Sequence, residues 1–306
     1  MRQRKETSHK SSIRITKDKI AFNIISYLLL GLFAVICVMP FYLIIVGSLS
    51  SEKALLVNGY QFYIQDFTLE AYELCFKGSS GVLTAYRNTI ILTVIGTAIN
   101  IIITTMTGYV LSRRDFQWRN IFSFFFFFTM LFNGGLVPSY IMNVRIWDFK
   151  NHWYALILPM MFSVWNMIIA KNYMVSLPYE IIESAKIDGA NDFAIFVRLI
   201  LPLSLPCVAT LTLFAGLHYW NDWMNCLLYI NKREMFTLQY YLQELLAKID
   251  SIKQDLEHTS GQVAQQLPEE SLKMAMTITV TGPIIFLYPF LQRYFVKGLT
   301  VGAVKG

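Results

Sequence analysis

Six long stretches of the chain contain no Asp, Glu, Lys or Arg and are rich in apolar side chains. They hold between 19 and 32 residues each and cover residues 20–51, 88–112, 120–144, 151–170, 199–221 and 274–292. A helix needs about 20 apolar residues to cross the roughly 30 Å hydrocarbon core of a bilayer, because it rises about 1.5 Å per residue. The pattern therefore predicts an all-α membrane protein with six transmembrane helices.

Composition supports this interpretation. The chain has 306 residues, of which 55% are hydrophobic and 15% are charged, whereas soluble domains carry about 25% charged residues. A soluble protein with buried helices is the alternative, and six windows of this length argue against it. The first window exceeds the apolar region of a signal peptide, about 7–15 residues, and no small-x-small cleavage motif follows it. We therefore expect it to remain as a membrane anchor.

The distribution of Lys and Arg predicts the orientation, because these residues collect on the cytoplasmic side of a membrane. With a cytoplasmic N-terminus, the inner segments carry 16 of the 26 basic residues and 7 of the 20 acidic ones; these segments are 1–19, 113–119, 171–198 and 293–306. The sequence therefore predicts an N-in/C-in topology. Seven of the basic residues lie in 1–19, and anionic membrane lipid is a simpler partner for them than nucleic acid.

The expected organisation is a single helical domain with two tails. Residues 1–19 form a basic cytoplasmic tail, 20–297 form the six-span domain, and 298–306 form a cytoplasmic C-terminal tail. Within the outer segments, Thr68 can cap a short helix, and the extracytoplasmic loop 222–273 carries apolar side chains at helical spacing that predict an amphipathic helix. Pro268, Glu269 and Glu270 suit the first turn of the last span.

Two polar positions within the apolar stretches are candidates for a solute path. The run Asn133-Gly134-Gly135-Leu136-Val137-Pro138 predicts a kink or an unwound turn, which either lines a cavity or allows close helix packing. The cluster Tyr219-Trp220-Asn221-Asp222-Trp223 is either an interfacial aromatic belt or a place where a sugar stacks on aromatic rings and binds amides. The candidate path residues are Asn133, Trp165, Asn166, Tyr219, Trp220 and Asn221.

A charged, glycine-broken hairpin over 177–202 separates two apolar stretches. Pro178 can occupy the first position of a helix that has Glu180 and Glu183 one turn apart. Gly189 can adopt a positive φ and reverse the chain. Asn191 or Asp192 can then cap a second short helix that ends at Leu201-Pro202, where the fifth span begins. This cytoplasmic helix-turn-helix is typical of a docking surface for a soluble partner, and a plain loop with solvated charges would need neither the glycine nor the prolines.

Catalytic and metal chemistry have no support in the sequence. The four cysteines and four histidines are scattered, without metal-ligand or disulfide spacing. No G-x-x-x-x-G-K-[ST] motif occurs, so we expect no ATP site on this chain. The spans also lack the ionisable relays of ion-coupled carriers, and any energy for transport is expected to enter from a partner.

At the hairpin the sequence resembles the EAA coupling motif of permeases of binding-protein-dependent ABC importers, E-A-A-x3-G-x9-I-x-L-P. Glu183, Ala185, Gly189, Leu201 and Pro202 match it, whereas Ser184 and Leu199 replace an Ala and the Ile. The residues around Gly189, the Leu201–Pro206 run, Trp220-Asn221 and the segment 292–300 are similar to the carbohydrate-uptake, maltose-permease-like branch. Residues 133–138 and 153–159 are similar to a subgroup that handles complex oligosaccharides.

The resemblance implies a permease subunit of a bacterial cytoplasmic membrane, without catalytic residues, metal or cofactor of its own. Its partners would be a second homologous permease subunit, two ATPase subunits that bind ATP and Mg, and an extracellular solute-binding protein. The residues expected to couple to the ATPase are Glu180, Glu183, Ser184, Ala185, Asp188, Gly189, Ala190, Phe196, Leu201 and Pro202. The alternatives are an importer for amino acids or peptides, an ion-coupled secondary carrier, and a membrane receptor or scaffold.

Overall fold

The computed structural model describes residues 17–77, 80–259 and 269–285. Within these residues the backbone forms helices and loops, and an isolated antiparallel bridge pairs Ser50 with Phe67. The predicted all-α fold is thus confirmed for the part of the chain that the structure describes. Both predicted tails lie largely outside these residues, as do Pro268 and the end of the last predicted span.

The N-terminal half consists of two long helices, α1 and α4, with shorter helices between and after them. These elements are α1 (Lys17–Ser48), α2 (Glu52–Asn58), α3 (Glu70–Lys77), α4 (Ser80–Ser112), α5 (Arg119–Leu131), α6 (Leu136–Arg145), α7 (Tyr154–Ile157), the 3₁₀ turn η1 (Leu158–Met160) and α8 (Val164–Val175). As predicted, the Thr68 hydroxyl accepts a hydrogen bond from the backbone N of Glu70 at the start of α3, at 3.2 Å.

The C-terminal half contains the hairpin, a long apolar helix and the predicted amphipathic helix. These elements are α9 (Glu180–Ile187), α10 (Asp192–Ile195), the π-helical segment η2 (Phe196–Ile200), α11 (Leu201–Leu203), α12 (Leu205–Trp220), α13 (Met224–Tyr229), the 3₁₀ turn η3 (Arg233–Met235) and α14 (Leu238–Thr259). A further helix covers 270–285. The amphipathic helix predicted in the outer loop is therefore confirmed as α14.

Only two of the described helices, Asp18–Ser48 and Gly81–Ser112, are long enough and apolar enough to cross a membrane by themselves. Three further apolar stretches are helix pairs bent by 108° at 132–135, 48° at 161–163 and 83° at Ser204. The structure therefore has up to five candidate spans in its described residues. The first bend confirms the predicted kink, and Gly135 has a φ of +88° there.

The predicted transmembrane stretches 151–170 and 199–221 are each divided between two helices that meet at a bend. Pro159 lies in the 3₁₀ turn before the first break, and the Ser163 hydroxyl then caps α8 by accepting from the backbone N of Asn166. At the second break, the hairpin helix continues past Pro202 to Leu203, and Pro206 opens a new helix after Ser204. Each proline lacks the N–H that would continue a helical ladder, so the axis turns nearby.

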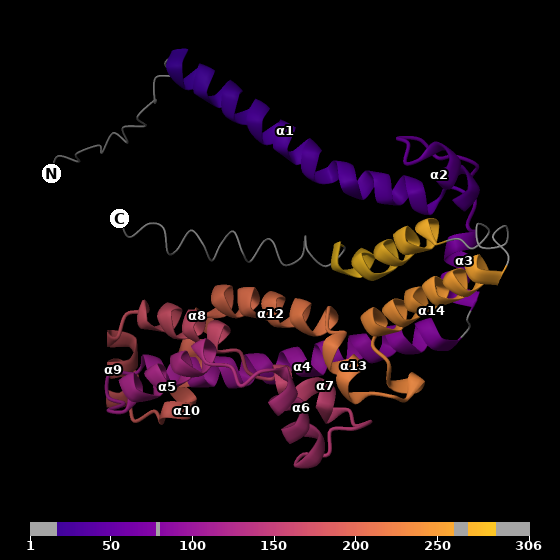
Figure 1. The fold of residues 1–306 in the computed structure, drawn as a ribbon. Coiled ribbons are helices and arrows are strands. Elements are labelled where there is room, and N and C mark those ends of the chain that lie inside the picture. The colour runs from indigo at the N-terminus through magenta and orange to yellow at the C-terminus, as the bar shows by residue number, and fades with distance from the viewer. Residues whose placement is uncertain (1–16, 78–79, 260–268, 286–306) are drawn as a thin grey trace.

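The long helix α4 organises the fold, with α8 and α12 lying along it (Figure 1). Small residues allow this contact. A Cβ on Gly108 would lie 2.8 Å from the Cβ of Ala170 and 3.1 Å from the backbone N of Lys171, and a Cβ on Gly96 would lie 2.4 Å from the ring of Tyr219. Glycine at these positions lets the helix backbones approach closely.

Helix α1 stands apart from this bundle (Figure 1). Of its most apolar window, 6% is buried inside the chain, against 33% for α4. It is joined to the rest at its C-terminal end, where the carboxylate of Glu52 in α2 accepts hydrogen bonds from the backbone N of Glu270 at 3.0 Å and of Ser271 at 2.8 Å. This carboxylate caps the helix over 270–285.

Candidate functional site

The hairpin has the predicted turn. Gly189 has a φ of +80°, and the Asn191 side chain accepts a hydrogen bond from the backbone N of Ala194 at 2.8 Å. Pro178 does not occupy the first helical position, because α9 begins at Glu180 with Tyr179 as its N-cap. The sequence thus predicted the reversal and the second cap correctly, and missed the first helix start by two residues.

One face of the hairpin is packed against the bundle. Ile182, Ala185 and Phe196 are buried in a cluster with Tyr109 of α4 and Met174 of α8. The rings of Phe196 and Tyr109 lie 5.3 Å apart. Ala185 and Phe196 were expected to couple to an ATPase, and the structure places their side chains against the bundle.

The opposite face of the hairpin is open. Glu180, Glu183, Ser184, Asp188 and Gly189 are exposed, as is Pro202, while Ala190 and Leu201 are half-buried. Two large apolar side chains add to this face, Ile187 at 86% exposure and Phe193 at 66%. Within the described part of the chain neither Glu180 nor Glu183 forms an ion pair. This face therefore presents free carboxylates beside exposed apolar groups, a combination that suits a protein partner.

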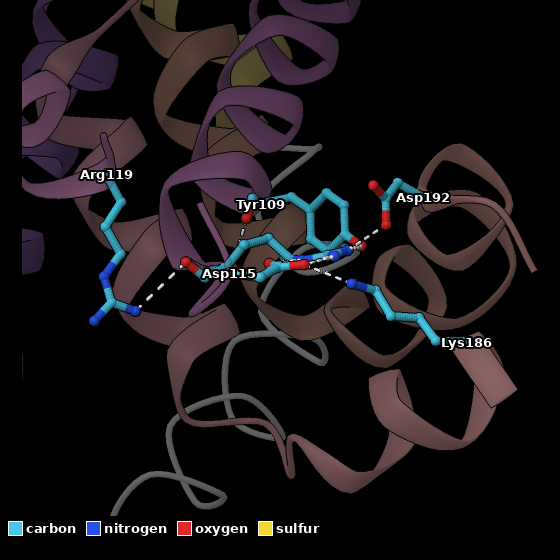
Figure 2. A network of polar contacts seen from close by, with 7 residues as sticks. Tyr109, Asp115, Arg119, Lys186 and Asp192 are labelled. Atoms are coloured by element: carbon cyan, nitrogen blue, oxygen red, sulfur yellow. Dashed lines mark hydrogen bonds and ion pairs between the residues drawn. The ribbon is translucent and has the colours of Figure 1, made fainter. Parts of the chain in front are cut away.

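A buried arginine joins the hairpin to the end of α4. The Arg113 side chain is 6% exposed and reaches two carboxylates, Asp115 in the following loop and Asp192 at the start of α10. Its Nε and Nη2 donate to Asp115 at 2.8 and 2.6 Å, and its Nη1 donates to Asp192 Oδ1 at 2.8 Å and to the hydroxyl of Tyr109 at 2.6 Å. Figure 2 shows this network converging between the helices.

Lys186 of α9 completes the network by donating to Asp115 Oδ2 (Figure 2). Both helices of the hairpin are therefore tied to the same side-chain cluster, α9 through Lys186 and α10 through Asp192. The hydrogen bonds from Arg113, followed by that from Lys186, hold the pKa of the Asp115 carboxyl well below its usual range. Asp115 in turn raises the pKa of Arg113. The pair formed by Arg113 and Asp115 is thus charged near neutral pH, and the network built on it links the hairpin to α4.

The sequence did not reveal this network. Arg113 was counted only among the basic residues of the inner segment 113–119, and Asp115 was given no role. The only local signal is an acid that directly follows a basic pair, Arg113-Arg114-Asp115. The partners Asp192 and Arg113 are 79 positions apart, a pairing that no short motif contains.

Two clefts lie at the C-terminal end of α12, which is the end away from the hairpin. The first, about 420 Å³, is bordered by the start of α8 and includes Asn100, Trp165, Asn166, Phe214 and His218. The second, about 400 Å³, continues from it, because Phe214 and His218 line both, and it includes Asn221. We call the two together the His218 cleft. Sequence reasoning missed His218, Asn100 and Phe214, which carry no motif.

The structure thus brings together Trp165, Asn166 and Asn221 of the six predicted path residues. The other three lie elsewhere. The buried Tyr219 donates its hydroxyl to the carbonyl O of Ile157 at 2.9 Å, and the Nε1 of Trp220 donates to the carbonyl O of Val280 at 3.2 Å. Asn133 lies in the exposed break before α6, where its side chain accepts from the backbone N of Gly135.

The His218 cleft combines rings with amide, hydroxyl and imidazole groups. Trp165 is 60% exposed and offers a free aromatic surface, while Asn100 and Asn166 border the same space. At its far end the Asp222 carboxylate accepts from the side chain of Asn225 at 3.1 Å, and burial raises the pKa of Asp222. Among the described residues no group of three His, Cys, Asp or Glu side chains is placed to hold a metal ion. The cleft therefore suits a polar solute with apolar faces.

Comparison with protein families gives a match over most of the chain. The family described as binding-protein-dependent transport system inner membrane component matches residues 106–301. This region includes the hairpin, the Arg113 network and the His218 cleft apart from Asn100, and it covers more than half of the chain.

Individual relatives are similar over nearly the whole chain. The protein LplC of Bacillus subtilis is 38% identical over 95% of this chain and 97% of its own length. The polygalacturonan/rhamnogalacturonan transport system permease protein YtcP of the same organism is 36% identical over 93% of this chain and 98% of its own. A solved structure of a bacterial ABC transporter involved in the import of the acidic polysaccharide alginate contains a chain that is 28% identical, with a TM-score of 0.77 over 92% of this chain and 98% of that chain.

Proposed function

Because the chain belongs to the family of binding-protein-dependent transport system inner membrane components, we propose that it is a permease subunit of an ATP-driven importer of sugars or oligosaccharides. In this role it is a transport component without a catalytic site, and it forms half of a translocation pathway. Its place is the cytoplasmic membrane of a bacterium.

The carbohydrate cargo is supported by two observations. Relatives are named for the transport of polygalacturonan, rhamnogalacturonan and alginate. Independently, the His218 cleft places the exposed ring of Trp165 beside the side-chain amide of Asn166. A sugar has an apolar face that stacks on an aromatic ring and hydroxyl groups that need hydrogen-bonding partners. Amino acids and peptides remain the alternative cargo.

We propose six spans in an N-in/C-in arrangement. The two long apolar helices and the three bent pairs supply five candidate spans. The helix over 270–285 covers the first part of the sixth predicted stretch, 274–292. The excess of Lys and Arg in 1–19, 113–119, 171–198 and 293–306 supports this orientation. It places the hairpin in the cytoplasm and the His218 cleft toward the outer half of the membrane.

The hairpin is the proposed entry point for energy. The partners are a second homologous permease subunit, two ATPase subunits that bind ATP and Mg, and an extracellular solute-binding protein. An arginine on an ATPase subunit would pair with the free carboxylate of Glu183. The observation that carries the proposal is the attachment of both hairpin helices to α4 through Arg113 and Asp115, because a rigid attachment transmits a displacement to a spanning helix.

Glu183→Arg in the assembled complex tests this proposal. The substitution places a cation where the partner's cation is expected, so ATP-driven uptake into proteoliposomes should be abolished while the amount of chain in the membrane stays unchanged. Gly189→Pro should act in the same way, because proline cannot adopt a φ of +80°. Glu70→Arg, an equal charge change on an exposed residue of α3, is the control. Normal uptake by both hairpin variants would contradict the proposal, and uptake driven by an ion gradient without ATPase subunits would favour a secondary carrier.

A further inference from the structure

A cleft of about 360 Å³ lies where α4 ends, α5 begins and α8 meets the hairpin, and its polar lining is basic. Arg114, Arg119 and Lys171 line it together with uncharged residues, and no Asp or Glu is among its lining residues. We call it the basic cleft. It is separate from the His218 cleft, and it shares Met174 and Ile182 with the cluster that packs the hairpin against the bundle.

None of the three cations is neutralised by a carboxylate in the described part of the chain. Lys171 Nζ donates to the hydroxyl of Ser123 at 2.8 Å, Arg119 Nη1 donates to the carbonyl O of Arg113 at 3.4 Å, and the guanidinium carbon of Arg114 lies 4.9 Å from the centre of the Tyr179 ring. The carboxylate nearest in sequence, Asp115, is bound to Arg113 and Lys186. Three like charges facing one cleft repel one another, so an anion bound there is favoured.

The donors favour a phosphate group. Arginine guanidinium groups match phosphate oxygens in geometry as well as in charge, and lysine adds a point charge. The hydroxyl of Ser112 and the amide of Asn120 border the same cleft and supply neutral donors.

The position and the remaining walls favour a lipid as the bearer of this phosphate. The cleft lies where two candidate spans end, at Ser112 and at Arg119, and Trp118 beside it is 58% exposed, as is typical of the membrane–water interface. Apolar side chains, including Leu111, Met174 and Val175, form its other walls. Basic clefts between spanning helices at this depth suit anionic lipid head groups.

We propose that the basic cleft binds the phosphate group of an anionic phospholipid of the cytoplasmic leaflet. The assignment to the cytoplasmic leaflet rests on the orientation given in the proposed function, whereas the binding of a lipid phosphate to the cleft does not. Tyr179 and Ile182 of the hairpin region also line this cleft. A bound head group therefore contacts the hairpin as well as α5 and α8, and it stabilises the position from which the hairpin acts.

The test measures lipid binding to the full chain in detergent by native mass spectrometry, with phosphatidylglycerol and phosphatidylcholine added separately. The double variant Arg119→Gln, Lys171→Gln should hold phosphatidylglycerol about 25-fold less tightly, because each of the two basic groups near the membrane surface contributes about a factor of five. The matched control is Arg198→Gln, Lys232→Gln, which removes the same charge from two exposed residues outside the cleft. Residues 1–19 are unchanged in every variant, so nonspecific attraction by that segment is constant.

A charge-conserving variant separates binding from folding. Arg119→Lys, Lys171→Arg should bind phosphatidylglycerol within about twofold of the wild type, and circular dichroism should give equal helix content for all variants. A photoactivatable phosphatidylglycerol should label peptides from 111–120 and 171–182.

Three results would overturn the proposal. These are equal binding of phosphatidylglycerol and phosphatidylcholine by the wild type, equal binding of phosphatidylglycerol by the Gln variant and its control, and displacement of the lipid by millimolar inorganic phosphate, which would identify a small phosphate as the ligand. The measurement involves no transport. If the chain binds phosphatidylglycerol as expected but supports no uptake in the full complex, the proposed function is refuted and the lipid proposal stands.

Discussion

Asp192, the first residue of α10, accepts a hydrogen bond at 2.8 Å from Arg113, which directly follows α4 and lies 79 positions earlier in the chain. The same arginine holds Asp115, and Asp115 holds Lys186 of α9. One side chain thus connects the end of a spanning helix to both arms of the hairpin. In the proposed orientation, a push on the hairpin from the cytoplasm is therefore expected to displace α4 as well.

Arg113→Gln should uncouple the hairpin from α4. The variant loses the forked contact with Asp115 and the bond to Asp192, and we expect a loss of about 1–2 kcal/mol in the free energy of unfolding, since both partners are partly exposed. ATP hydrolysis by the complex should continue while uptake falls, which paired assays in proteoliposomes can measure. Arg145→Gln, at an exposed arginine of α6, should leave both ATP hydrolysis and uptake unchanged. An equal loss of uptake in this control would show that Arg113 has no specific role in coupling.

The contribution of Asp115 should depend on pH in the acid range. Its pKa is depressed in the fold below the ordinary value of 3.8, so the unfolded chain takes up the proton first as the pH falls. The stabilisation is therefore fully present above about pH 4 and is lost as the pH falls through the depressed pKa. Thermal unfolding in detergent should show a constant difference between wild type and Asp115→Asn above about pH 4, and this difference should shrink steadily as the pH falls below that value. A difference that stays constant on acidification would contradict the charge pairing.

Gly189 should tolerate asparagine better than alanine. Its φ of +80° costs a residue with a Cβ roughly 1–2 kcal/mol, and asparagine visits this region more readily than alanine. No atom outside the neighbouring residues lies within 4 Å of a Cβ built there, so backbone conformation alone decides the order. Uptake should rank wild type, then Gly189→Asn, then Gly189→Ala. An alanine variant as active as the wild type would show that the turn changes shape in the working complex.

Substitutions at two aromatic residues of the predicted path should have different effects, one on solute uptake and the other on stability. Trp165→Ala removes an exposed ring from the His218 cleft and should lower solute uptake without lowering the unfolding temperature. Tyr219→Phe removes a buried hydrogen bond to Ile157 and should lower stability by about 1 kcal/mol with little effect on solute affinity. Measured together, uptake and thermal unfolding distinguish a lining residue from a packing residue; the reverse pattern would exchange their roles.

Much of the architecture could be predicted because membranes impose a length. Five of the six charge-free stretches overlap α1, α4 and the three bent pairs. The chain reversal at Gly189 could be predicted because glycine adopts a positive φ more readily than other residues. The bends near Met161 and at Ser204 could not be predicted from the apolar composition, because a stretch is equally apolar whether its helix is straight or broken. Prolines marked both places without indicating the angle.

The sites were less predictable, since they depend on which face of a helix meets a neighbour. Tyr219 and Asn221 are two positions apart, and the structure buries the first in helix packing and leaves the second at a cleft. Arg113 differs from Arg114 only by one step along the chain, yet the first is buried in an ion-pair network and the second lines the basic cleft. Residue type alone does not distinguish these neighbours.

The isolation of α1 bears on how the stability of this protein should be measured. A helix with 6% of its apolar window buried by its own chain shares little cooperative unfolding with α4, α8 and α12, because cooperativity requires common packing. A probe on α1 and a probe on α12 should therefore report different transitions in the isolated subunit, and a two-state fit would describe neither. The transitions should merge only where another protein chain packs against α1, so coincidence of the two curves is itself an assay for assembly.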